Sequence, residues 1–342
     1  AISLGLAATA AVVVSPAVAQ ACAGLIGSNG AVNLGRTTTL AAYHEGFEHY
    51  VTSFEFQGGG GEFGTLIPLP GVPTKVERGG AWTLQRLQLE TQPPFAARVE
   101  ALSAAEDSAG GARVLLETRI DALDITVLEG GGASVATWAQ EHGFRLSPDA
   151  PEVLDFYARR SPIFLAAVFD GEAAAARGQQ FGDGTPVHLT IPTDNPWVPL
   201  RILALGKQPE DRVEADVFLL TGGEPSLLPD GNGVLRITHS EPATSLLLDD
   251  LRADDGMTWV PERAWLTKAS IDGEAGDVTF DLAVDASGAG RPSPVAAGFE
   301  LPSVDDGGAS AKELVLTLLA VVALSFGAVF VLGAGRRALG AP

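Results

Sequence analysis

The residues most able to do chemistry near the start of the chain are His44 and His49. Two histidines four positions apart on one helix face can bind a single zinc ion. Here the histidines are five positions apart, Gly46 lies between them, and the flanking residues favour strands. We therefore expect a β-hairpin at this place. A metal site at His44 and His49 is the less favoured alternative.

Other sequence patterns that accompany catalysis are incomplete. No G-x-S-x-G motif occurs, so no serine stands in a nucleophile elbow. The glycine runs at 58–61 and 130–132 lack the lysine and hydroxyl residue of a phosphate-binding loop. Acidic pairs that begin at Asp249 and Asp254 do not have the spacing of a calcium loop, and we interpret them as solvated loops. The sequence thus predicts no catalytic residue and no cofactor.

The charge balance restricts the class of partner. The chain has 42 acidic and 22 basic residues, which gives a formal net charge of −20. Such a field repels nucleic acid, because a phosphate backbone must be neutralised by Lys and Arg. The acidic surface either keeps the chain soluble or attracts cations or a basic partner. One cysteine, Cys22, excludes an intramolecular disulfide.

The C-terminal end has the composition of a membrane anchor. Residues 314–334 contain no charge, and as a helix they would span roughly 30 Å, the thickness of a hydrocarbon core. Basic residues directly after a span favour the cytoplasmic side, so residues 335–342 are expected to form a cytoplasmic tail. A buried core helix is the alternative. The residues expected to hold the chain in membrane lipid are Leu314, Phe326, Phe330, Leu332, Arg336 and Arg337.

The N-terminal end resembles a secretory signal peptide. Residues 1–21 contain an apolar stretch and then small residues at Ala17, Ala19 and Ala21, which suit a cleavage site. A retained N-terminal anchor and a lipid on Cys22 are less favoured alternatives. These ends place residues 22–285 outside the cell as an ectodomain. The segment 286–313, rich in Gly, Ser, Pro and Asp, becomes a stalk or packs on the domain.

The ectodomain is expected to have an α+β fold that is mainly antiparallel, with two central helices, and one or two subdomains. Residues 37–56 have the pattern of a hairpin that turns at Glu45 and Gly46. Apolar spacing predicts helices at 133–142 and 151–160, and the apolar run 163–169 is typical of a strand buried on both faces.

The remaining segments are expected to be mostly strands. At residues 82–89 alternation fits better than helical spacing. Apolar runs separated by Pro, Gly, Asp and Asn predict further strands in the second half. These strands are expected at 187–191, 198–205, 213–220, 235–239, 264–270 and 278–284.

The order of these segments resembles the DUF2330 family of bacterial proteins. The resemblance is carried by TTLAAYHEGFEHYVTSFEF, by FGTLIPLPGVPTKVERGGAWTLQRL and by VATWAQEHGFRLSPDAPEVLDFYARRSPIFLAAVF. The resemblance extends roughly from Ala21 to Leu220 and implies export from the cytoplasm. None of its motifs is catalytic.

The expected function follows from the topology. We expect a single-pass protein of the cell membrane with its ectodomain outside, acting as a non-catalytic binding, scaffold or accessory subunit. Its expected partners are membrane lipid and another protein of the envelope or of a membrane complex. The alternative is an envelope hydrolase whose site is assembled from residues distant in the sequence.

Overall fold

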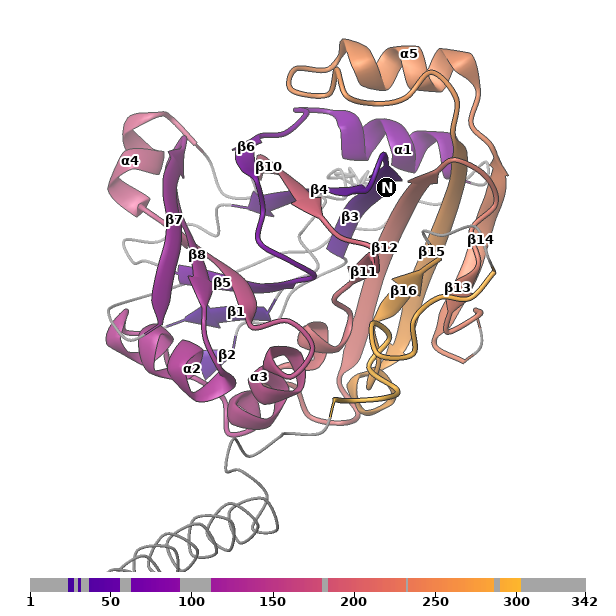
Figure 1. Cartoon of the computed structure of the whole chain (residues 1–342). Helices are drawn as coiled ribbons and strands as arrows, with labels where there is room; N and C mark the ends of the chain where they lie inside the picture. Colours follow the sequence, from indigo (N-terminus) through magenta and orange to yellow (C-terminus); the bar gives the residue numbers. More distant parts are fainter. Residues whose placement is uncertain are drawn as a thin grey trace, which may run out of the picture. The chain divides into compact units, whose positions relative to one another are not determined.

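The computed structural model describes the greater part of residues 24–302. The described ranges are 24–27, 30–31, 37–55, 63–92, 112–179, 184–231, 233–285 and 290–302. They form a mixed α+β fold in which antiparallel sheets dominate (Figure 1).

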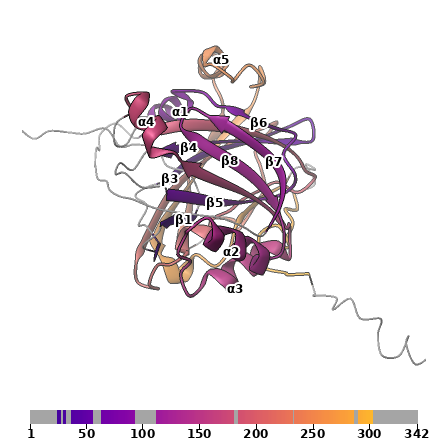
Figure 2. The same cartoon turned by 90° about the vertical axis from the view of Figure 1, so that its left-hand side faces the viewer.

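One of the two large sheets has six strands and is antiparallel throughout. Figures 1 and 2 show this sheet in two views related by a rotation of 90°. Its strands, in spatial order, are β2 (Gly30–Ala31), β1 (Gly24–Gly27), β5 (Phe63–Leu69), β9 (Ile163–Phe169), β8 (Leu123–Glu129) and β7 (Arg113–Ile120). The strand β9 lies inside the sheet and is almost wholly buried, which confirms the prediction for residues 163–169.

A seven-stranded sheet contains one parallel pair, β12 beside β3, among antiparallel neighbours. Its order is β14 (Leu235–Pro242), β15 (Trp265–Glu274), β12 (Arg212–Thr221), β3 (Thr37–His44), β4 (Phe47–Glu55), β10 (Gly184–Pro192) and β6 (Lys75–Arg78). A small third sheet joins β11 (Trp197–Val198), β16 (Leu282–Val284) and β13 (Leu227–Leu228).

The largest hydrophobic core lies between the two large sheets. Ile67, Ile125 and Leu165 contribute to it from the six-stranded sheet. Tyr50 and Leu219 contribute from the seven-stranded sheet, and all five side chains are buried. Successive residues of a strand face opposite sides, so the other side of each sheet needs its own cover.

Helices cover these outer sides and make the arrangement four-layered. The helices α2 (Gly132–Glu141) and α3 (Ala150–Ala158) pack on the outer side of the six-stranded sheet. The helices α1 (Thr83–Thr91) and α5 (Ser245–Ala253) pack on the outer side of the seven-stranded sheet. A short helix, α4 (Gly171–Ala176), completes the five α-helices of the described residues.

Several local predictions are confirmed. The hairpin turns at Glu45 and Gly46, whose φ angles of 51° and 83° are those that a two-residue turn needs. The helix α2 ends before Gly143, which has a φ of 73°. The helix α3 begins after Asp149, but the Asp149 carboxylate accepts a hydrogen bond from the Gly206 N–H instead of capping the helix.

Other local predictions are wrong. Residues 83–89 belong to helix α1 and not to a strand, because contacts from distant residues hold Trp82 and Arg86 in place. The predicted strand 198–205 is reduced to the end of β11 and a 3₁₀ turn, η1 (Arg201–Ala204). In the predicted strand 278–284 only β16 forms, after a second 3₁₀ turn, η2 (Ala275–Asp277). The helices α4 and α5 were not expected.

The predicted end segments fall largely outside the described residues. This applies to the signal peptide 1–21, Cys22, the membrane segment 314–334 and the tail 335–342. The predicted anchor residues Leu314, Phe326, Phe330, Leu332, Arg336 and Arg337 all belong to this undescribed part. None of the helices that the structure does describe has the length and apolarity needed to cross a bilayer.

Part of the expected stalk is described. Within residues 290–302, Ala296 and Ala297 are buried in the core beneath α2 and α3. The Arg160 guanidinium donates to the Ala296 carbonyl, and the Asp281 N–H donates to the Ala297 carbonyl. This part of the segment therefore packs on the domain, which is the alternative that its composition left open.

Candidate functional site

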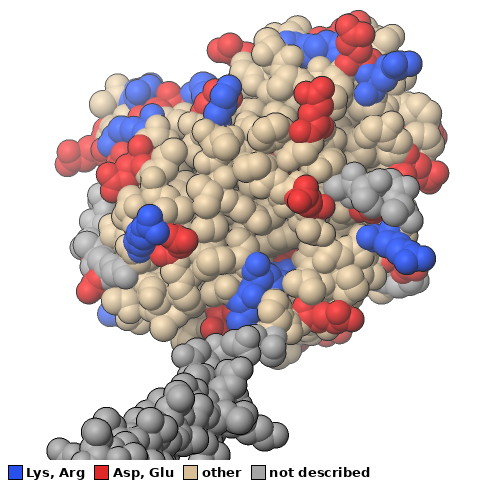
Figure 3. All heavy atoms as spheres, viewed as in Figure 1, with Lys and Arg blue, Asp and Glu red and all other residues tan. Residues whose placement is uncertain are grey.

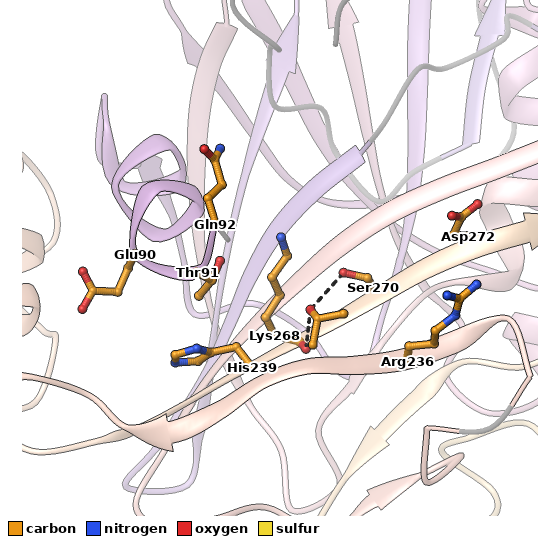
Figure 4. A pocket seen from close by; sticks show the side chains of 9 residues that line it. Glu90, Thr91, Gln92, Arg236, His239, Lys268, Ser270 and Asp272 are labelled. Carbon is orange, nitrogen blue, oxygen red and sulfur yellow. Dashed lines mark hydrogen bonds between the residues drawn. The ribbon is translucent and has the colours of Figure 1, made fainter. Parts of the chain in front are cut away.

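A groove of about 500 Å³ lies on the outer side of the seven-stranded sheet, beyond the end of helix α1 (Figure 4). One wall is the end of α1, and the floor is formed by strands β14 and β15. The residues that line the groove are Glu90, Thr91, Gln92, Arg236, Thr238, His239, Lys268, Ser270 and Asp272.

The floor of the groove is organised around a buried carboxylate, Asp216 on β12. The Ser270 hydroxyl donates to Asp216 Oδ1 at 2.7 Å, and the Lys268 ammonium lies 3.2 Å from Asp216 Oδ2. The Thr238 hydroxyl lies 3.3 Å from the Ser270 hydroxyl. A buried charge is stable only when it is paired and hydrogen-bonded, and Asp216 meets both conditions. The floor is therefore a preorganised set of polar groups.

An irregularity in β14 decides which side chains reach the groove. The pairing of β14 with β15 shifts between Ile237 and His239, so Thr238 is an extra residue, a β-bulge. Arg236 pairs with Ser270 before the bulge, and His239 pairs with Lys268 after it. The bulge thus places Arg236, Thr238 and His239 on the groove side together, which regular alternation would not do.

Tertiary contacts hold helix α1 as the wall of the groove. The buried Asp254 carboxylate accepts hydrogen bonds from the N–H groups of Ala81 and Trp82 and from the Thr83 hydroxyl. These donors lie at the start of α1, because Ala81 and Trp82 directly precede its first residue, Thr83. Arg86 on α1 also forms an ion pair with Asp250 on α5 at 2.9 Å.

A second polar cluster lies on the same side of the sheet, away from the groove lining. His49 Nδ1 and His188 Nε2 are 2.9 Å apart, on neighbouring strands β4 and β10. The Trp259 ring stacks on His49 with 4.0 Å between ring centroids and an interplanar angle of 4°. Glu77 Oε1 lies 3.5 Å from His188 Nδ1 and favours a proton on that nitrogen.

The electrostatics of this histidine pair favour its neutral form. Burial, followed by repulsion from His44 and Lys75, lowers the pKa of His49 to about 4. Burial, followed by repulsion from His49 and Lys75, lowers the pKa of His188 to about 3. Two neutral imidazoles can share one hydrogen bond without charge repulsion. Among the described residues, His188 Nδ1 on the far side of its ring has no hydrogen-bond partner.

The two histidines considered as a metal site, His44 and His49, occupy different positions in the hairpin. His44 lies at the end of β3, with 44% of its side chain exposed and Glu45 at 3.7 Å. In the β3–β4 pairing, His44 stands opposite Phe47 and His49 stands opposite Ala42. Among the described residues there is no group of three or more His, Cys, Asp or Glu side chains suited to a metal ion.

A buried carboxyl, Glu48, points to the other side of β4, between the sheets. Glu48 Oε2 accepts a hydrogen bond from the Trp197 N–H at 3.3 Å, and Oε1 has no hydrogen-bond partner within the described ranges. Burial raises the pKa of Glu48 to about 8, against the smaller opposing effect of the Trp197 hydrogen bond. The side chain is therefore a neutral carboxylic acid at pH 7.

The comparison with protein families matches residues 16–221 to the family described as "Uncharacterized protein conserved in bacteria (DUF2330)". The match covers more than half of the chain. The chain belongs to the DUF2330 family. The earlier resemblance is thereby confirmed over nearly the same residues.

The DUF2330 match ends one residue beyond Leu220, so it divides the groove. The end of α1 and Asp216 lie inside the matched region. Arg236, Lys268 and Ser270 lie after it. The wall and the central carboxylate thus belong to the family region, whereas the two strands of the floor, β14 and β15, follow it.

Comparison with solved structures finds similarity to baculovirus P35. A mutated baculovirus P35 after caspase cleavage shares 8% identity, over 73% of this chain and 99% of that chain, with a TM-score of 0.39. The caspase-8/P35 complex shares 9% identity over 74% and 91% of the two chains, with a TM-score of 0.35. Similarity at this level carries no argument about function. No curated protein sequence matches the chain.

The residues of the groove were not predicted from the sequence, although a signal for them exists. Lys268, Ser270 and Asp272 alternate with buried Ala269 and Ile271 along β15. An alternation of buried apolar and polar residues marks a strand with one polar side. What this signal does not contain is the approach of α1 and β14, which turns the polar side into a groove.

Proposed function

We propose that this chain is a non-catalytic binding protein anchored at the cell surface, and that its groove binds the ligand. The observation that carries the proposal is the groove of about 500 Å³, built from polar side chains on two strands and one helix. This volume is within the range of small-molecule sites, roughly 300–1,000 Å³. Groups fixed on strands before binding lose little conformational entropy when a ligand arrives.

The interior of the groove supports binding because its polar groups are held in place. Asp216 fixes Ser270 and Lys268 through a hydrogen bond and an ion pair. Thr91 and Gln92 add a hydroxyl and an amide from the wall. Together these groups offer both donors and acceptors to a polar ligand.

The anchoring part of the proposal rests on the sequence of the two ends. Residues 1–21 serve as a signal peptide, residues 22–285 form the extracellular domain, and residues 314–334 cross the membrane once. Residues 335–342, with Arg336 and Arg337, remain in the cytoplasm. In this arrangement the domain engages an envelope ligand, or serves a membrane complex as an accessory subunit.

Protease treatment of intact cells tests the anchoring. A protease added outside is expected to digest the domain and to leave a membrane-bound fragment of the C-terminal segment. The fragment is identified by mass spectrometry, with a cytoplasmic protein as the control for cell integrity. A domain that resists the protease in intact cells and is digested after lysis would contradict the proposed topology.

Filling the groove tests the binding function. Thr238→Trp introduces a large ring at an exposed position of the groove, whereas Thr137→Trp introduces the same ring on the exposed side of α2. After gentle extraction of the full chain, mass spectrometry is expected to find a ligand with the wild-type chain and with Thr137→Trp. The ligand is expected to be lost from Thr238→Trp. Its retention in Thr238→Trp would exclude the groove as the site.

One observation favours a second candidate, an envelope hydrolase. The Ser270 hydroxyl lies at the floor of the groove and donates to a buried carboxylate at 2.7 Å, as a nucleophile with a base would. We place the hydrolase second because Asp216 already forms an ion pair with the Lys268 ammonium. A fluorophosphonate probe that labels the wild-type chain, and fails to label Ser270→Ala, would favour the hydrolase.

A further inference from the structure

The acidic side chains in and beneath the groove all have basic partners. Three ion pairs account for them. They are Glu90–Arg86 at 2.7 Å, Asp272–Arg212 at 2.6 Å and Asp216–Lys268 at 3.2 Å. A carboxylate that is already paired offers less attraction to a cationic ligand than a free one. The acidic residues of the groove therefore do not make it a cation site.

The basic side chain Arg236 has a different environment. It is exposed on β14, the edge strand of the seven-stranded sheet, and it lines the groove. Within the described part of the chain, Arg236 makes no ion pair and no side-chain hydrogen bond. A free guanidinium presents donors in a planar fork that matches a carboxylate with two parallel hydrogen bonds.

Two hydroxyl residues lie beside Arg236 on the floor of the groove, and the Asp272 carboxylate, which is paired with Arg212, lies on its other side (Figure 4). Arg236 pairs directly with Ser270 across the two strands, and the Thr238 hydroxyl lies beside the Ser270 hydroxyl. Figure 4 shows Ser270 on the floor near Arg236, whereas Gln92 and Thr91 lie at the end of α1, across the groove. Such hydroxyls and amides suit a ligand that carries hydroxyl groups of its own.

The overall charge of the chain disfavours anion binding, and Arg236 is a local source of attraction for an anion. The formal net charge is −20, so the molecule as a whole repels anions. Attraction of an anion must therefore come from short-range contacts in one place. A free guanidinium inside the groove supplies such a contact.

From this arrangement we propose that the groove binds a sugar acid, with the ligand carboxylate on Arg236. The sugar hydroxyls contact Thr238 and Ser270 beside it, and Thr91 and Gln92 on the wall across the groove. The proposal rests on the binding function of the groove and names its ligand class. An acidic peptide offers the carboxylate without the hydroxyls, so it matches the surroundings of Arg236 less well.

Titration of the full chain in detergent with trigalacturonate tests this assignment. The methyl ester of the same trisaccharide is a matched neutral probe, and a hexaglutamate peptide is the competing anion. The wild-type chain is expected to bind trigalacturonate at least tenfold more tightly than the ester. One charge-assisted pair is expected to contribute a tenfold or larger difference of this kind.

Two arginine variants separate a local contact from general electrostatics. Arg236→Gln is expected to weaken trigalacturonate binding at least tenfold and to leave binding of the ester unchanged. Arg145→Gln removes the same charge from an exposed position between α2 and α3, and it is expected to bind as the wild type does. Unfolding curves monitored by circular dichroism establish that both variants are folded.

Several results would overturn the assignment. These are equal binding of the acid and the ester, equal binding by Arg236→Gln and the wild type, or tighter binding of hexaglutamate than of trigalacturonate. If trigalacturonate does not bind while Thr238→Trp still loses the native ligand, the sugar-acid assignment fails and the binding function stands. If Thr238→Trp retains the native ligand, the binding function of the groove fails as well.

Discussion

At the scale of single residues, Glu48 shows how strongly position controls chemistry in this molecule. Its neighbour His49 faces the helix side of the sheet and pairs with His188, whereas Glu48 faces the core between the sheets. Burial raises the pKa of Glu48 to about 8 and lowers that of His49 to about 4. Two adjacent titratable groups are thus both neutral at pH 7 because both are removed from water.

Glu48→Gln tests this assignment through the pH dependence of stability. The folded-state pKa of about 8 exceeds the reference value of 4.5, so the folded chain keeps a proton that the unfolded chain loses. The free energy of unfolding of the wild type should therefore fall as pH rises from about 5 to 8, by on the order of 1.4 kcal/mol per pH unit from this group. Glu48→Gln should lack this decrease and be the more stable chain at pH 8.

Urea unfolding at a series of pH values measures this difference. Glu117→Gln changes an exposed glutamate of β7 and is expected to follow the pH dependence of the wild type. Parallel pH profiles for Glu48→Gln and the wild type would show that the Glu48 carboxyl is ionised in the folded chain.

The limits of sequence reasoning at this scale are physical. The sequence indicates that His44 and His49 belong to a hairpin, but the partner of His49 is His188, which is 139 positions away. The bulge at Thr238 cannot be foreseen from alternation either, because it depends on pairing with β15. For these reasons no groove residue was predicted.

At the scale of elements, α1 illustrates a helix that depends on tertiary contacts. Its apolar spacing is poor, and the sequence therefore favoured a strand at this place. The structure stabilises its start through the Asp254 carboxylate, which accepts three hydrogen bonds from residues 81–83. By contrast, α5 was not expected although the sequence contains a signal for it. Thr244 is a residue type that caps helices and accepts from the Leu247 N–H, and the apolar residues Leu247, Leu248 and Leu251 form the buried side.

Asp254→Ala is expected to loosen α1 and, with it, the wall of the groove. The variant leaves the buried Thr83 hydroxyl and two partly buried N–H groups without an acceptor, which should destabilise the chain by about 2–3 kcal/mol. Hydrogen exchange should become faster in α1, and thermal unfolding should occur at a lower temperature. Asp255→Ala, at the exposed neighbouring position, is the control. Unchanged exchange in α1 of Asp254→Ala would contradict the role given to this carboxylate.

At the scale of the whole molecule, the class of fold was accessible from the sequence and the arrangement of its strands was not. Alternating and continuous apolar runs indicated a mainly antiparallel α+β domain, as the sheets confirm. The parallel pairing of β12 with β3 joins residues near 40 to residues near 218. Contacts between such distant segments arise from packing of complete sheets and leave no local pattern.

The same packing explains why a groove exists at all. The helices α1 and α5 cover only part of the outer side of the seven-stranded sheet, and the groove lies where α1 ends. On the side of the molecule seen in Figure 3, acidic and basic side chains are interspersed. The strongly acidic composition therefore does not appear there as a continuous field of one sign.

Site-specific crosslinking in living cells tests the central claim, binding in the groove, most directly. A photoreactive phenylalanine derivative at position 238 of the full chain lies in the groove, and the same residue at position 137 lies on the exposed side of α2. We predict a ligand adduct at position 238 and none at position 137, as read by mass spectrometry after illumination. No adduct at position 238, or the same adduct at both positions, would contradict the account.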